Sequence, residues 1–207
     1  MARTPSDALR WMADGQRLLS SVIAGLDASD FRADSLLPGW TRGHLVAHVA
    51  GNAEALGNLV IWAATGVETP MYASPEERAA SIERGAALPA ADLTAWEAGS
   101  ATALAEGLDR LTMAQWAHEI RTAQGRLLPA TEIPWLRARE VMVHTVDLAL
   151  GIGFADLPAD FLSALVSDIK AKRGDVPAVD ARLPEVAAWL AGRPHSLTDA
   201  PDLGPWL

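Results

Sequence analysis

Residues 41–66 read TRGHLVAHVAGNAEALGNLVIWAATG, and they predict a long helix with a defined start and end. Thr41 is suited to cap the first turn through its side-chain oxygen, and Gly66 is suited to end the last turn. Within this helix His44 and His48 are four residues apart, so both side chains lie on one helical face. The segment therefore predicts a helix that carries potential metal ligands.

A second segment repeats the pattern. Residues 137–150 read RAREVMVHTVDLAL and predict a helix that begins near Thr131 and ends at Gly151. Glu140 and His144 are again one turn apart and share a face. Two imidazoles and one carboxylate, with a position left open, are the ligand set of a catalytic zinc site. Helices that face each other inside a bundle are able to bring such pairs together.

The rest of the chain predicts a mainly α fold. Apolar residues recur at helical spacing over 6–26 and 91–111, which gives four long helices in all. Residues 67–90 are rich in proline and predict a long crossover on the outside, with a short helix over 75–84. Residues 117–129 predict a loop or a short extended piece. This pattern is typical of an antiparallel four-helix bundle with one long crossover connection.

The pattern also predicts how the chain is divided. Residues 1–155 are expected to form the metal-binding bundle, and residues 156–207 a short C-terminal extension packed on it. The extension contains a helix near its start and a second, apolar one in LPEVAAWLAGR, with irregular segments rich in Pro and Asp around them.

Composition excludes several classes of function. The formal net charge is −9, and an acidic surface repels phosphate backbones, so no nucleic-acid partner is expected. No run of apolar residues is long enough to span a membrane, and the first residues lack the apolar segment of a secretory signal. The chain has no cysteine, which excludes disulfides and a cysteine nucleophile and fits a cytoplasmic location. Any thiol chemistry must therefore use a thiol from outside the chain.

The residue pattern alone leaves the metal site open. A histidine in an amphipathic helix is usually a surface group or a hydrogen-bonded core group, and two-residue motifs have high false-positive rates. Glu140 is equally suited to an ion pair with Arg137 or Arg139 on its own helix. The periodicity also does not choose between His44 and His48.

Two stretches resemble a known family. Residues 37–78, LPGWTRGHLVAHVAGNAEALGNLVIWAATGVETPMYASPEER, and residues 122–151, TAQGRLLPATEIPWLRAREVMVHTVDLALG, resemble the mycothiol-dependent maleylpyruvate isomerases. The resemblance covers about residues 1–155 and implies a DinB-like metal-binding bundle. It implies a divalent metal, with zinc favoured, held by His48, Glu140 and His144. The histidine that matches position 44 is not a ligand in that family.

The resemblance also implies a reaction. The family uses mycothiol to convert maleylpyruvate to fumarylpyruvate, a cis–trans isomerisation in gentisate-type aromatic degradation. Arg193, in AWLAGRPHSLT, matches an arginine that contributes to activity, so it is expected to act in catalysis and to bind substrate. Arg42 and Arg126 are further candidates for substrate binding, and Asp147 is a candidate partner of the metal ligand His144.

Other readings remain beside this one. The same bundle would serve a mycothiol S-transferase that acts on other electrophiles, or a non-catalytic metal-binding protein. The partners expected for an isomerase are maleylpyruvate and mycothiol, in a monomer or small homo-oligomer. The tail after residue 155 is expected to be a shortened form of the family's C-terminal region.

Overall fold

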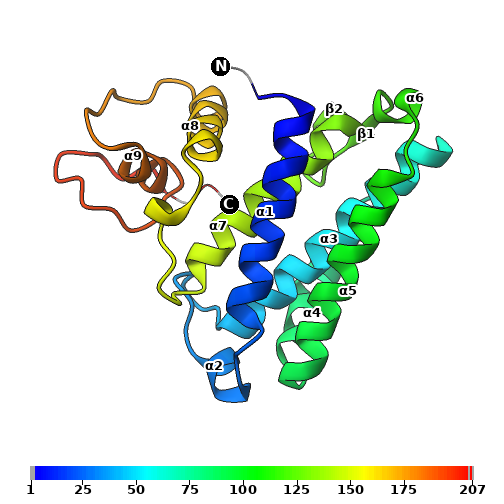
Figure 1. Ribbon diagram of the computed structural model, residues 1–207, viewed down its shortest axis with the longest axis horizontal. Helices are drawn as coiled ribbons and strands as arrows, with labels where there is room; N and C mark the ends of the chain where they lie inside the picture. The colour runs from blue at the N-terminus through cyan, green and yellow to red at the C-terminus, as the bar shows by residue number, and fades with distance from the viewer. Residues whose placement is uncertain (1–2, 205, 207) are drawn as a thin grey trace. The chain divides into compact units, whose positions relative to one another are not determined.

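The computed structural model describes residues 3–204 and 206. Their contacts form two compact units, of which the larger comprises Pro5–Ala149 and the smaller comprises residues 150–204 and 206 with residues 3–4. The elements of both units are labelled in Figure 1.

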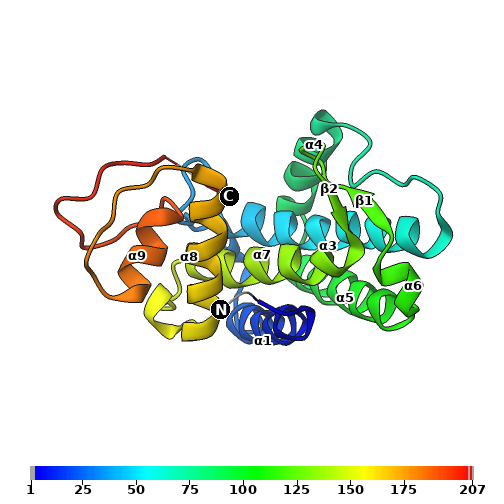
Figure 2. The same ribbon diagram turned by 90° about the horizontal axis from the view of Figure 1, so that it is seen from above.

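Four long helices build the larger unit: α1 (Pro5–Ile23), α3 (Arg42–Thr65), α5 (Ala90–Asp109) and α7 (Ile133–Asp147). Helix α1 packs along α7, α3 packs along α5, and α3 also contacts α7 (Figures 1 and 2). The predicted mainly α, four-helix bundle is confirmed.

The crossover decides the directions of these helices. An ideal Cβ on Gly51 would contact Trp96, and one on Gly107 would contact Val60, so residue numbers rise together along α3 and α5. These two neighbours therefore run parallel, because the connection between them returns to the end of the bundle where α3 begins (Figure 1). Helices α3 and α7, by contrast, run antiparallel, and this is the pair that carries the candidate ligands.

Local signals explain the bounds of α3. The side chain of Thr41 accepts a hydrogen bond from the backbone N–H of His44, and the His44 ring interacts in return with the backbone of Thr41. Gly66 ends the helix with a φ of 73°, which is the left-handed conformation that glycine adopts at low cost. Both predicted caps of this helix are confirmed.

Helix α7 ends earlier than predicted. It stops at Asp147 rather than Gly151, and Ala149 takes a φ of 56°, which breaks the helical path. Nε of Arg42 donates to the carbonyl of Leu148 at 2.8 Å and so satisfies a backbone group at the helix end. This contact comes from a distant part of the chain, and the local sequence did not predict it.

The crossover contains α4 (Pro75–Ala86), which confirms the short helix predicted over 75–84 and whose first turn is capped by Ser74. The other connections are more ordered than predicted. Two short helices were missed, α2 (Ala28–Arg32) and α6 (Met113–Trp116). The extended piece after α6 is a small antiparallel hairpin of β1 (Glu119–Arg121) and β2 (Leu127–Pro129), in which Glu119 faces Pro129.

The smaller unit contains two helices that pack on each other, α8 (Ala159–Arg173) and α9 (Leu183–Leu190). A 3₁₀ turn at Phe154–Asp156 contacts α9. Arg173 holds the end of the chain by donating to the carbonyls of Leu190 and Leu203. In the described part of the chain, no helix combines the length and apolarity that a membrane crossing requires.

Candidate metal centre

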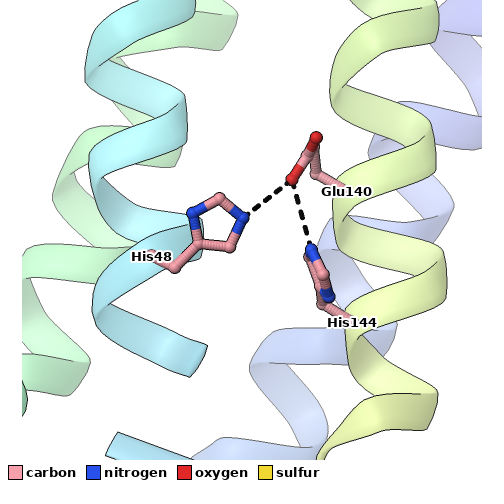
Figure 3. A group of neighbouring side chains, drawn as sticks. All are labelled: His48, Glu140 and His144. Carbon is pink, nitrogen blue, oxygen red and sulfur yellow. Dashed lines mark hydrogen bonds and ion pairs between the residues drawn. The ribbon is translucent and has the colours of Figure 1, made fainter. Parts of the chain in front are cut away.

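Three side chains from two helices meet between α3 and α7 (Figure 3). Oε2 of Glu140 lies 3.1 Å from Nε2 of His48 and 3.3 Å from Nε2 of His144. Glu140 and His144 are four residues apart on α7, so they share a face, and the antiparallel α3 presents His48 opposite them. Ligand atoms of the three residues all lie within 4.8 Å of one another.

Contacts behind the cluster fix the two rings. Nδ1 of His144 lies 2.8 Å from Oδ2 of Asp147, which is wholly buried at the end of α7. A carboxylate at Nδ1 holds the proton there and leaves Nε2 free to coordinate a cation. The centre of the Trp40 ring lies 5.5 Å from that of the His48 ring, and the two ring planes are tilted by 59°. His48 and His144 are both buried, whereas Glu140 remains partly exposed.

The cluster is strongly coupled in charge. Burial alone raises the pKa of Glu140, but hydrogen bonds from His144 and His48 outweigh it and hold that pKa well below its usual value. Burial lowers the pKa of His144, but hydrogen bonds to Asp147 and Glu140 outweigh this and raise it. Burial lowers the pKa of His48 more than Glu140 raises it. Without a cation, the surroundings thus favour the ionised form of Glu140, the protonated form of His144 and the neutral form of His48.

These donors fit a divalent cation. Two imidazole nitrogens and one carboxylate oxygen, gathered in one place, form the protein part of an open catalytic site, and zinc, iron, manganese and nickel all accept such a set. A dication bound there would supply positive charge beside the Glu140 carboxylate. The second carboxylate, Asp147, is already in the position that a ligating histidine usually requires.

His44 lies outside this cluster. Its Nδ1 is 2.7 Å from the hydroxyl of Thr41, and its Nε2 is 3.4 Å from Oε2 of Glu83. The ring is thus part of the cap that begins α3. Sequence periodicity could not separate the two histidines, because the packing of the helices decides which of them lies against α7.

Comparison with known proteins identifies the family. The model of the mycothiol maleylpyruvate isomerase N-terminal domain matches residues 12–149, which include all three clustered side chains. The chain belongs to the mycothiol maleylpyruvate isomerase family. A comparison with curated protein sequences gives no match.

Solved structures extend the family match over both units. A crystal structure of a mycothiol-dependent maleylpyruvate isomerase is similar with a TM-score of 0.88 and 33% identity, covering 99% of this chain and 98% of that one. A histidine-to-alanine variant of such an isomerase is similar with a TM-score of 0.86 and 32% identity, covering 96% and 97%. The expectation of a shortened tail is therefore wrong with respect to these isomerases. The helical bundle agrees with the DinB-like fold that the resemblance implied.

The three arginines predicted to bind substrate lie in different parts of the structure. Arg42 donates to the carbonyls of Leu148 and Ala149, so its guanidinium is engaged at the end of α7. Arg126 is exposed in the turn between β1 and β2. Arg193 lies in the smaller unit, where it is buried and donates to the carbonyl of Ala191 at 2.8 Å. The roles of all three in substrate binding stay predictions.

One arginine next to the ligands was missed. Nη2 of Arg78, on α4, lies 3.2 Å from Nδ1 of His48, and its guanidinium carbon lies 5.7 Å from the centre of the Tyr72 ring. Both residues belong to MYASPEER, a stretch that carried the resemblance but suggested no role for any single side chain. Only the folding of the crossover against α3 brings Arg78 to the cluster.

Proposed function

We propose that this chain catalyses the mycothiol-dependent conversion of maleylpyruvate to fumarylpyruvate. The observation that carries the proposal is the cluster of His48, Glu140 and His144, supported by Asp147, in a chain of this isomerase family. The absence of cysteine from the chain agrees with a reaction that takes its thiol from solution.

The reaction needs a nucleophile and a place for negative charge. A thiolate adds to one carbon of the cis double bond, and the electron pair of that bond moves onto the conjugated carbonyl oxygen as an enolate. The former double bond is now single and rotates. The enolate then re-forms the double bond in the trans geometry and expels the thiolate unchanged. The reaction therefore consumes no thiol, and the product has the same atoms as the substrate.

The chain's own residues prepare this chemistry. His48, Glu140 and His144 would hold a divalent cation, which would lower the pKa of a thiol beside it and so favour the reactive thiolate. Asp147 keeps the proton of His144 on Nδ1, so Nε2 stays directed at the open centre. Trp40 lies beside His48, with 5.5 Å between the centres of the two rings. Zinc as the metal, a catalytic Arg193 and a cytoplasmic location are the finer parts of this proposal.

The test is an isomerisation assay with purified, zinc-loaded protein. Maleylpyruvate should be converted to fumarylpyruvate only when mycothiol is present, and the mycothiol should be recovered in full. Consumption of one thiol per turnover would instead indicate an S-transferase. Turnover without any thiol would contradict the proposed mechanism.

Matched variants test the ligand assignment. His48→Ala should lose bound metal and activity, because it removes one of three donors. His44→Ala should keep both and only weaken the start of α3, since His44 contacts Thr41 and Glu83 instead. Elemental analysis of the two purified variants measures this directly. Full metal retention by His48→Ala would refute the assignment.

A further inference from the structure

A cavity of about 190 Å³ opens beside the metal centre, between α3 and the segment that leads into α4. His48 forms one wall, and Tyr72 and Arg78 form the opposite part. Because His48 also faces Glu140, a molecule in this cavity lies one imidazole ring away from the reacting centre. The cavity is therefore in a position to hold the substrate next to the metal centre.

Arg78 is the cation in this cavity that lacks a carboxylate partner. It makes no ion pair with any carboxylate among residues 3–204 and 206, and its contacts are the His48 ring and the Tyr72 ring. The two acids that line the same cavity are engaged elsewhere. Oε1 of Glu77 accepts from Arg84 at 2.5 Å, and Oε1 of Glu54 accepts from Trp96 at 2.7 Å. Arg78 is thus the one arginine or lysine side chain among the residues that line the cavity.

Metal binding at His48 would also change the hydrogen bond between His48 and Arg78. A guanidinium only donates hydrogen bonds, so its contact with Nδ1 of His48 requires that nitrogen to carry no proton. A neutral histidine that coordinates a cation through Nε2 must carry its proton on Nδ1. The two donors then face each other, and Arg78 loses its acceptor. Its N–H groups are then open to water or to a ligand in the cavity, and a carboxylate matches their fork geometry.

We propose that Arg78, braced by Tyr72, binds a carboxylate of the substrate in this cavity. This rests on the proposed function, which supplies a substrate with two carboxylates. The Tyr72 ring faces the guanidinium and limits its movement. Arg78 would orient the substrate so that its double bond meets the thiolate, and it would offset the repulsion that a chain of charge −9 exerts on a dianion.

Binding is measured first without catalysis. Maleate, a small cis dicarboxylate, is titrated by calorimetry into zinc-loaded wild type, Arg78→Gln and Arg78→Lys in the absence of thiol. Arg78→Gln should bind maleate at least about tenfold more weakly, and Arg78→Lys should lie between, because an ammonium lacks the fork. Arg110→Gln is the control, since it removes the same charge from an exposed pair with Glu106. It should bind within about twofold of wild type.

Kinetics then distinguish the substrate from the thiol. Arg78→Gln should raise KM for maleylpyruvate by at least about tenfold, leave KM for mycothiol unchanged and retain its zinc. Wild-type affinity for maleate in Arg78→Gln, or a rise only in KM for mycothiol, would overturn the assignment. The proposed function is tested separately. If wild-type protein binds maleate through Arg78 but isomerises no maleylpyruvate, the carboxylate-binding role of Arg78 stands and the proposed reaction is refuted.

Discussion

Asp147→Ala should weaken zinc binding although it removes none of the three predicted ligands. The Asp147 side chain is wholly buried, and its Oδ2 lies 2.8 Å from Nδ1 of His144. The substitution leaves the three ligand side chains in place but removes the acceptor that fixes the His144 ring and its proton. Loss of such a partner typically weakens metal binding about 10- to 100-fold, which is about 1.4–2.7 kcal/mol.

The assay is a competition between the protein and a chelator of known zinc affinity. Asp147→Asn should recover part of the loss, because an amide oxygen can still accept from Nδ1. Thr145→Val is the matched control, since Thr145 is equally buried on α7 but its hydroxyl donates to the carbonyl of Val141 at 2.6 Å. Its zinc affinity should remain within about threefold of wild type.

Stability must be measured beside affinity, because Asp147 lies at the end of α7. Thermal unfolding of the metal-free variants shows whether Asp147→Ala disturbs the fold, and comparison with Thr145→Val corrects for disturbed packing. Zinc affinity of Asp147→Ala within about threefold of wild type, in a folded protein, would refute the view that Asp147 orients His144.

Three further predictions concern the bundle and its charges. Arg137 is wholly buried, 3.6 Å from the carboxylate of Glu97, and burial lowers its pKa only to about 10, so the side chain stays charged. Arg137→Met would leave Glu97 buried without this partner, and it should lower the free energy of unfolding by about 3–5 kcal/mol. The double variant with Glu97→Met should cost less than Arg137→Met alone in chemical denaturation. Gly15→Ala should lower stability by about 1–3 kcal/mol, since its Cβ would lie 2.5 Å from a side-chain carbon of α7, whereas Gly57→Ala, with open space, should raise it by about 0.5–1 kcal/mol. Because the pKa of His144 is raised above its ordinary 6.5, its contribution to the stability of metal-free protein is complete below pH 6.5 and is lost as the pH rises through the raised pKa. Unfolding midpoints of chelated wild type should therefore fall over that range, and a His144→Gln variant should fall less.

Short elements show one limit of the sequence. The helices α2 and α6 have five and four residues, so they are too short to show a helical period. Helices of this length are also unstable alone and form only when the surrounding structure holds them. The end of α7 is a second case, because Arg42 closes it from a segment about a hundred residues away.

The sequence by itself determined what depends on neighbours along the chain. The caps Thr41 and Gly66 set the bounds of α3, and a four-residue spacing placed Glu140 and His144 on one face, because helix geometry repeats every 3.6 residues. The tertiary structure alone decided what depends on the approach of distant segments. It directed His48 rather than His44 at α7, and it brought Arg78 from the crossover to the His48 ring. Those outcomes depend on how the helices rotate and cross when they bury their apolar faces, and no local pattern contains that information.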